Sequence, residues 1–303
     1  MEFTSRPYTD PADRQTVLDF VRTVRPPERV FDYPSLNDLE EQLPQPEVQA
    51  NSRLWFAGDK LVAFALVDPW DNLWFDLQPA QQAALGDEIV QFGVDCLRAR
   101  LAAGEAGNLE TNCAENYSAR RAFLEAHGFL ALPEQTLGFA RPLSEPIPDP
   151  VLPPGYSLRL LKGRDEAAAA AALHCAAFGS DYMTTENRLA MMETSEYYPE
   201  MDLVIVAPNG ELAAYAMGFI SIEENEKTGR KDGYVDPIAT HPNHQRLGLA
   251  RALLLTGMQM LKARGMETAK FGTSSQNAGM QKTAAAAGFQ IENRKLWFRK
   301  VIE

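Results

Sequence analysis

The chain has 303 residues, 45% of them hydrophobic and 23% charged, which is typical of a globular protein with room for two domains. Its net charge of -12 arises in residues 1–155, which hold 24 of the 41 acidic and 12 of the 29 basic side chains; the rest of the chain holds 17 of each. This balance opposes contact with a phosphate backbone, so we expect no nucleic-acid partner.

Neither a membrane segment nor a secretion signal is predicted. No apolar run approaches the ~18 residues of a membrane span, and residues 1–26 are too charged for a signal peptide. Cys96, Cys113 and Cys175 have no CxxC spacing and are expected to be reduced, buried and not catalytic. We therefore expect a cytoplasmic protein with no membrane partner and no metal.

The front half alternates between helical and strand patterns. Apolar residues at helical spacing predict a helix over residues 10–25, which Pro26 and Pro27 end, and an acidic stretch predicts another over 37–51. Gly58-Asp59 between two apolar runs predicts a hairpin. The predicted strands are 54–57, 61–67, 73–77, 108–112 and 136–141, and the further helices are 89–101 and 118–127.

A proline-rich segment divides the chain. Five prolines between Ser144 and Pro154 predict an extended linker over residues 144–155. Beyond it the order of elements repeats: a strand at 156–161, helices at 165–178 and 185–193, a hairpin over 203–222, and a strand at 268–272. Asn116 and Gly128-Phe129 precede Asn277 and Gly288-Phe289 by 161 and 160 residues. We infer an internal duplication, with domains at 1–143 and 156–303.

One turn in the back half has the pattern of a phosphate site. Gln245, Gly248 and Ala250 fit Gln/Arg-x-x-Gly-x-Gly/Ala between an apolar strand and a helical run. Small residues let the backbone approach a pyrophosphate, whose charge the first helical amides stabilise, and Arg246 and Arg251 can add contacts. An ordinary strand-to-helix turn would give the same pattern. Residues 245–303 hold ten basic and three acidic side chains, which either form a solvated face or attract a polyanion.

With residues 239–242, Gly265, Asn277 and Gly288-Phe289, this turn resembles the GNAT superfamily of acyl-CoA-dependent N-acetyltransferases. The resemblance covers residues 156–300 well and 1–143 weakly, as in tandem members of the superfamily. It implies an α/β (α+β) fold: two tandem GNAT-like domains, each a mixed, mostly antiparallel sheet flanked by helices. It also implies acetyl-CoA as co-substrate.

The resemblance assigns acetyl-CoA to named residues. The pantetheine arm would bind the backbone of Ile238, Ala239 and Thr240, and Asn277 would bond the same arm. Asn277 could equally cap the helix that follows it. The diphosphate would lie on the turn and the first helical residues, which are Gln245, Arg246, Leu247, Gly248, Leu249, Ala250 and Arg251.

The front half departs from this pattern. No Gly-x-Gly/Ala pair follows Pro79, and we expect Asp87 and Glu88 to stand where phosphate would lie and to repel it. The front domain is therefore expected to keep the fold without binding acetyl-CoA, and to support its partner or shape the substrate cleft.

Amine acetylation needs a base and a proton donor for the thiolate. Asp236, on the strand that carries residues 238–240, is the first candidate base, and Glu223 and Glu224, at the end of the preceding strand, come next; each could also be an exposed or structural carboxylate. His241 and His244 are interpreted as local hydrogen-bonding groups and His174 as a plain helix residue. Many GNAT members have a tyrosine that donates this proton at the position where this chain has Ala284. Leu124 occupies the matching position in the front half. The thiolate would therefore be protonated by water, by Tyr182 or Tyr215, or not at all.

The acceptor is the least specified part. The resemblance implies that residues 179–185 line its site. Tyr197-Tyr198-Pro199 and Trp297 are expected to lie near it, although the tyrosines could equally fill the core. The acidic front half favours a cationic amine. The predicted function is transfer of acetyl from acetyl-CoA to a small amine. A non-catalytic acyl-CoA sensor and a protein-interaction scaffold remain the alternatives, and the oligomeric state stays open.

Overall fold

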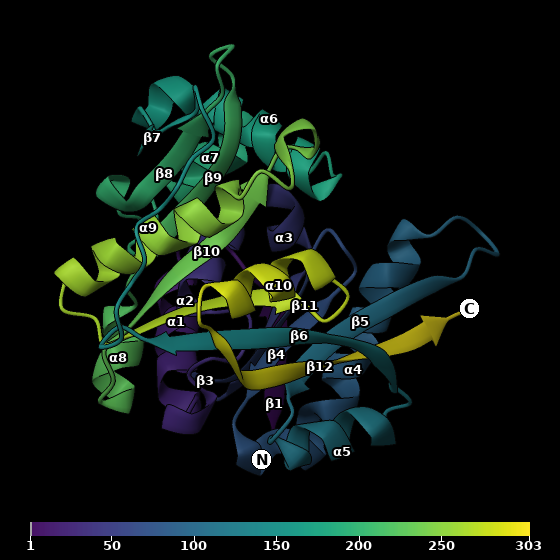
Figure 1. Ribbon diagram of the computed structural model, residues 1–303. Coiled ribbons are helices and arrows are strands. Elements are labelled where there is room, and N and C mark those ends of the chain that lie inside the picture. Colours follow the sequence, from purple (N-terminus) through teal and green to yellow (C-terminus); the bar gives the residue numbers. More distant parts are fainter. Residues whose placement is uncertain (1) are drawn as a thin grey trace. The chain divides into compact units, whose positions relative to one another are not determined.

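The computed structural model describes residues 2–303 and divides them into two compact units (Figure 1). Unit 1 consists of the chain up to Gln135 together with Lys295–Glu303, and unit 2 consists of Thr136–Arg294. In each unit helices flank a largely antiparallel sheet, so the predicted α/β class is confirmed. Within the described range, no helix combines the length and apolar character that crossing a membrane requires.

Unit 1 is built on an antiparallel sheet in the order β1-β2-β3-β4. Strand β3 is an almost continuous apolar run because both of its faces are covered, one by α4 and the other by α1 and α2. Its elements are β1 (Phe3–Pro7), α1 (Arg14–Val24), η1 (Pro27–Arg29), α2 (Leu36–Gln42), α3 (Pro46–Ala50), β2 (Ser52–Ala57), β3 (Lys60–Val67), β4 (Leu73–Leu77), η2 (Pro79–Gln81), α4 (Gln82–Arg100), β5 (Gly107–Ala114) and α5 (Ser118–Ala126).

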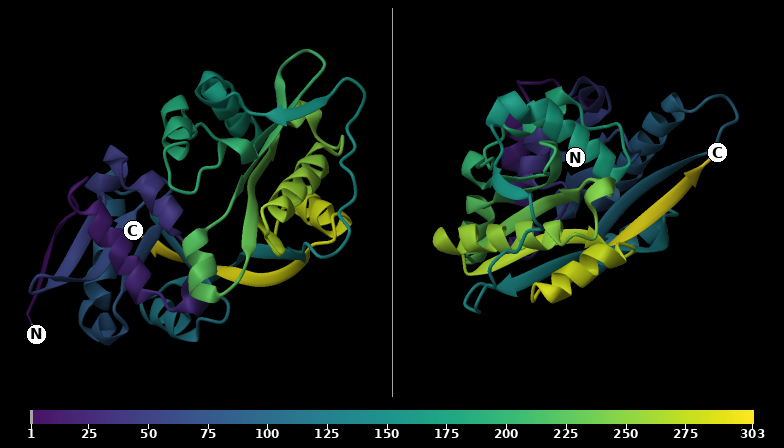
Figure 2. Two further views of the ribbon diagram at one scale, coloured as in Figure 1. Left: turned by 90° about the vertical axis from the view of Figure 1, so that its left-hand side faces the viewer. Right: turned by 45° about the horizontal axis from the view of Figure 1, so that its top comes forward.

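Unit 2 contains a sheet in the order β6-β11-β10-β9-β8-β7. Figure 2 shows α9 and α10 on one face of this sheet and α6 and α7 on the other. Its elements are β7 (Ser157–Leu160), η3 (Gly163–Glu166), α6 (Ala167–Phe178), α7 (Thr185–Met191), η4 (Pro199–Met201), β8 (Asp202–Val206), β9 (Leu212–Phe219), α8 (Ile222–Thr228), β10 (Asp232–Thr240), η5 (Pro242–His244), α9 (Leu249–Ala263), β11 (Thr268–Ser274) and α10 (Ala278–Ala286), completed by part of β6 (Leu130–Pro142).

The last strand of each half pairs with a strand of the other half. Residues 136–142 of β6 pair antiparallel with β11 in unit 2, and residues 295–302 of β12 (Gln290–Ile302) pair antiparallel with β5 in unit 1. Each long strand supplies an edge that its neighbour would otherwise leave unpaired. The compact units consequently do not end where the predicted domains end.

The proline-rich segment forms neither helix nor strand over residues 144–156. Ile147 and Leu152 pack against the main core of unit 2, and the carbonyl of Pro146 accepts a hydrogen bond from Arg141. The segment is thus irregular and lies on unit 2, and its role as a linker between domains stays a prediction. That residues 1–143 and 156–303 are two duplicated domains stays a prediction.

Candidate active site

The site in unit 2 begins where two parallel strands part. Asp232, Gly233 and Tyr234 of β10 pair with Thr268, Ala269 and Lys270 of β11, and beyond these three pairs the two described strands form no further ladder although both continue. On its other side β10 has one extra residue between Val235 and Ile238, a bulge against β9. An opening therefore separates β10 from β11, and residues 238–240, which pair with β9 on their other side, have no strand partner on the side of this opening.

Asp236 lies at the start of this opening. Its Oδ2 accepts a hydrogen bond from the backbone N–H of Gly272, 3.0 Å away on β11. The side chain thus bridges the two strands just after they stop pairing. Its predicted position on the strand of residues 238–240 is confirmed, and its role as a base stays a prediction.

The turn after β10 leaves room for a ligand at the start of α9. Arg246 and Gly248 have positive φ values of 62° and 82°, and a Cβ built on Gly248 would meet nothing within 4 Å. No side chain caps α9 and no acidic residue lies in its first turn, so its N-terminal amides and partial positive charge are free of an internal anion. The side chain of Gln245 donates to the carbonyl of Thr240, which closes the turn.

Two buried polar atoms beside this turn have no hydrogen-bond partner within the described chain. They are Oγ1 of Thr240, at the end of β10, and Nε of Arg251, in the first turn of α9. Buried polar atoms are usually paired, so these two fit a polar ligand that reaches from the strand opening to the helix. The residues present accordingly fit a pantetheine arm and its diphosphate.

Close packing at the middle of α9 fixes this helix relative to β10. A Cβ on Gly257 would lie 2.7 Å from Cγ2 of Val235, so the absent side chain lets the helix lie directly on the strand.

His241 caps η5 by accepting from the N–H of Asn243. His244 bonds the hydroxyl of Tyr156 at 2.9 Å and the carboxylate of Glu211 at 3.0 Å. Both histidines are thus local hydrogen-bonding groups, as interpreted from the sequence.

Glu223 and Glu224 do not lie at the end of a strand. They form the first turn of the short helix α8, which Ser221 caps by accepting from the N–H of Glu224. The sequence missed α8 because it has few apolar residues. Oε2 of Glu224 accepts a hydrogen bond from the hydroxyl of Tyr234 at 2.8 Å. Tyr234 lies on β10, two residues before Asp236, so this bond brings the carboxylate of Glu224 close to that strand.

Asn277 is a helix cap. Oδ1 of Asn277 accepts from the N–H of Met280 at 3.0 Å at the start of α10. The capping alternative is therefore confirmed, and contact of Asn277 with pantetheine stays a prediction. Ala284 is completely buried in the core of unit 2, so α10 offers no phenol at that place.

The aromatic residues expected around the acceptor lie in different parts of the structure. The hydroxyl of Tyr197 donates to Asp202 and that of Tyr198 to the carbonyl of Ile220. Trp297 belongs to unit 1, where its ring packs edge-on against Trp74 at 5.9 Å. Residues 295–302 of β12 pair with β5 in unit 1, and the expectation that Trp297 reaches the acceptor cleft stays a prediction.

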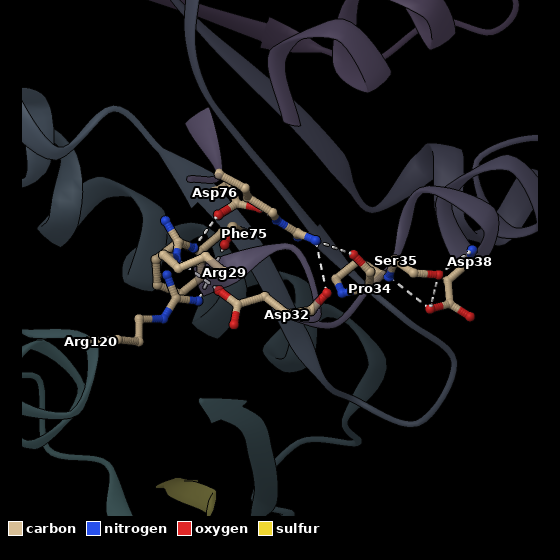
Figure 3. Close-up of polar contacts among 9 residues, drawn as sticks. Arg29, Asp32, Pro34, Ser35, Asp38, Phe75, Asp76 and Arg120 are labelled. Carbon is tan, nitrogen blue, oxygen red and sulfur yellow. Dashed lines mark hydrogen bonds and ion pairs between the residues drawn. The ribbon is translucent and has the colours of Figure 1, made fainter. Parts of the chain in front are cut away.

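In unit 1, too, two neighbouring strands do not form a ladder, but side chains of unit 1 occupy the space between them. One isolated parallel bridge joins Asn72, just before β4, to Glu110 of β5, and the two described strands form no ladder. Figure 3 shows the buried carboxylate of Asp76 on β4 bonded to Arg29, with Arg120 beside Phe75. The other ion pair of Asp76, with Arg25, has an N–O distance of 2.6 Å.

The guanidinium of Arg120 completes this cluster. It lies 3.3 Å from the centre of the Phe75 ring and donates to the Phe75 carbonyl. Burial lowers the pKa of Arg120 to about 10, and nearby Arg29 opposes its charge as well, while Asp76 and Asp32 favour it. A pantetheine arm would have to displace these packed and paired groups.

The front turn differs from its expected form. Helix α4 begins at Gln82, three residues after Pro79, with no acidic residue in its first turn. Asp87 and Glu88 lie further along the helix, where they bond His127 and the indole of Trp55. The prediction that these carboxylates occupy a phosphate position is wrong. The early start of the helix removes the glycine turn itself.

Comparison with known proteins finds a family match in the back half of the chain. Residues 168–289 match the acetyltransferase (GNAT) family. Mycothiol acetyltransferase of Thermobispora bispora is 29% identical over 157 residues, 49% of this chain and 51% of the relative. That of Streptomyces bingchenggensis is 26% identical over 166 residues, 52% of each. The chain spans about half the length of the curated relatives it matches.

Two solved structures resemble the whole chain. A GCN5-related N-acetyltransferase from Sphaerobacter thermophilus has a TM-score of 0.69 at 21% identity and covers 99% of this chain and 96% of its own. A tandem GNAT protein from the clavulanic acid biosynthesis pathway has a TM-score of 0.68 at 16% identity, covering 99% and 98%. Together with the family match, they confirm the predicted tandem GNAT fold.

Proposed function

We propose that this chain, a tandem GNAT-family acetyltransferase, moves acetyl from acetyl-CoA to a small amine by direct attack of the amine on the thioester. The observation that carries the proposal is one continuous path in unit 2: the opening between β10 and β11, the turn at Gly248 and the uncapped start of α9. The thioester supplies the activated carbonyl.

The residues along this path have separate tasks. Backbone groups of residues 238–240, which have no strand partner on the side of the opening, bind the amides of the pantetheine arm, and Oγ1 of Thr240 gains a partner there. The first amides of α9 bind the diphosphate, with Arg246 and Arg251 adding charge-assisted contacts. Leu247, 42% exposed, packs against the apolar part of the ligand.

Asp236 is the base in this proposal. Its carboxylate lies in the opening, held by the N–H of Gly272, and takes the proton of the attacking amine directly or through water. Glu224 is the alternative base, and its bond from Tyr234 ties it to the same strand. Glu223 shares the first turn of α8 and is the third choice.

The acceptor is a small amine of cationic character. The front half of the chain carries the whole net negative charge, which attracts cations at long range. Unit 1 has a supporting role without acetyl-CoA, because the Asp76 cluster fills its strand opening and its helix α4 lacks the glycine turn.

A non-catalytic acyl-CoA sensor is the competing function, and the buried Ala284 favours it because a phenol is missing there. Release of coenzyme A from acetyl-CoA, measured with a panel of polyamines, amino sugars and peptide N-termini, separates the two. Turnover that requires one class of amine and falls in Asp236→Asn supports the enzyme. Tight acetyl-CoA binding without turnover on any amine supports the sensor and contradicts the proposal.

A further inference from the structure

The side chains between β4 and β5 in unit 1 leave a small cavity. Its volume is about 10 Å³, which is room for a single water-sized atom. The charged residues of its lining are Arg25, Arg29 and Arg120 on the positive side and Asp32 and Asp76 on the negative side. Three guanidinium groups and two carboxylates therefore share the lining, and one positive charge has no counterpart there.

Two of the three arginines are satisfied by the carboxylates. Nε of Arg25 donates to Asp76 at 2.8 Å, and Nη1 of Arg25 donates to two backbone carbonyls. Arg29 donates to Asp32 at 2.8 Å and to the second oxygen of Asp76 at 2.7 Å. Both carboxylates are thus engaged by Arg25 and Arg29, so the excess positive charge belongs to Arg120.

Arg120 lies in the first turn of α5, beside the cluster (Figure 3). Its Nη2 donates to the carbonyl of Phe75 at 3.2 Å, and within residues 2–303 the guanidinium forms no ion pair and no second hydrogen bond. Burial lowers the pKa of Arg120 to about 10, and nearby Arg29 also opposes its charge. A negative group near Nε or Nη1 would offset both effects.

Asn112 is a second group of the lining that lacks a partner. It lies on β5 and is 9% exposed, and its side-chain amide has no hydrogen-bond partner in the described part of the chain. It is paired directly with Trp297 of β12, whose ring packs against Trp74 on the sheet face that α1 and α2 cover. Buried amides are usually paired, so Asn112 fits a ligand that accepts a hydrogen bond inside the cavity.

The start of α5 adds backbone donors beside the same cavity. No side chain caps this nine-residue helix and no acidic residue lies in its first turn, whereas Asn277 caps α10 in unit 2. Tyr117 precedes the first residue of α5, and its ring lies 4.5 Å from the guanidinium of Arg29. Tyr117 and Arg120 both line the cavity, so the free amides and partial positive charge of the helix start border it.

We propose that the cavity between β4 and β5 binds one small monovalent anion, held by Arg120, Asn112 and the first amides of α5. The size of the cavity excludes a diphosphate, so the ligand is a halide such as chloride or one oxygen of a small carboxylate. The anion supplies the missing negative charge and accepts a bond from Asn112. The bound anion ties α5 to both strands and stabilises unit 1, independently of the proposed acetyl transfer.

The line width of the chlorine NMR signal tests this proposal, with gluconate replacing chloride to keep the ionic strength constant. It is measured for wild type, Arg120→Gln and Arg121→Gln. Arg121 is the matched control, because it is the next residue on α5 and its side chain is 47% exposed beside Glu125. We expect saturable broadening in wild type and in Arg121→Gln, and an affinity about ten-fold weaker or worse in Arg120→Gln. Equal affinity in Arg120→Gln and wild type, or no saturable broadening in wild type, would overturn the proposal.

A second variant removes the amide without changing the charge. Asn112→Leu keeps a side chain of similar size, and we expect it to weaken chloride binding several-fold. Denaturant titration adds a readout on stability: the unfolding midpoint of wild type should be higher in chloride than in gluconate, and that of Arg120→Gln should be equal in the two salts. Unchanged chloride affinity in Asn112→Leu, or the same chloride effect on the midpoint in Arg120→Gln, would contradict the placement of the anion.

Formate distinguishes the two kinds of anion. Formate that narrows the chlorine signal of wild type to the width of the free ion supports the site and shows that a carboxylate oxygen also fits it. A signal that stays broad in formate supports a site for halides alone.

Discussion

The carboxylate of Asp236 accepts a hydrogen bond from the backbone N–H of Gly272 across the opening between β10 and β11. One residue therefore holds the edge of the opening and presents a carboxylate inside it. The two tasks can be separated by substitution, because an amide oxygen still accepts the same bond but takes no proton at neutral pH.

Asp236→Asn is expected to lower kcat about 100-fold or more while acetyl-CoA affinity stays close to wild type, because the amide keeps the bond to Gly272 and loses the base. Steady-state kinetics with calorimetry measures both quantities. Glu224→Gln is the matched comparison. A larger loss of kcat in Glu224→Gln than in Asp236→Asn would transfer the role of base to Glu224.

The Asp76 cluster predicts a strong effect on stability in unit 1. Asp76 is 1% exposed and Arg25 4%, so Asp76→Asn leaves buried guanidinium groups without a carboxylate and should cost about 3–5 kcal/mol in the free energy of unfolding. Denaturant titration at pH 7 measures this. Asp87→Asn is the control, because Asp87 is almost fully exposed beside His127. Similar losses in both variants would contradict a structural role for the cluster.

The same cluster predicts a pH dependence. Burial alone would raise the pKa of Asp76, but the charges of Arg25 and Arg29 outweigh it and hold this pKa below its ordinary value. Stabilisation from a lowered carboxyl pKa is complete above the unfolded value of about 3.9 and is lost as pH falls through the folded value. The difference between wild type and Asp76→Asn should therefore be full at pH 7 and shrink below about pH 4. A difference that grows on acidification would refute this assignment.

The exchanged strand β12 should stabilise β5. Phe298 is completely buried in the core of unit 1, so Phe298→Ala is expected to cost about 3–5 kcal/mol and to speed amide hydrogen exchange in β5. Val301→Ala is the control on the same strand, because Val301 is 59% exposed. Unchanged exchange in β5 would argue against the pairing of residues 295–302 with that strand.

Local patterns predicted most elements but not their long-range partners. The strand predicted at residues 73–77 agrees with the structure, since an apolar run acts over a few residues. The choice of β5 as partner for β12 could not be predicted, because alternation in a strand shows which face is buried and not which strand lies beside it.

The same limit applies to the candidate site. Gly248 and its turn were evident because a positive φ and a close ligand both require small residues there. The bond from Tyr234 to Glu224 depends on helix α8, which has too few apolar residues to be recognised from the sequence. The filled opening at Asp76 likewise depends on arginines from three separate segments.

Calorimetry of acetyl-CoA binding to Gly248→Glu and Gly265→Glu tests the central claim most directly. The two glycines lie near opposite ends of α9 with φ values of 82° and 81°, and a Cβ on either would meet nothing within 4 Å, so the backbone strain of the two substitutions is matched. The carboxylate added at Gly248 would lie where the diphosphate binds. We expect Gly248→Glu to abolish binding and Gly265→Glu to keep wild-type affinity; equal affinity of both variants for acetyl-CoA would contradict the placement of the site.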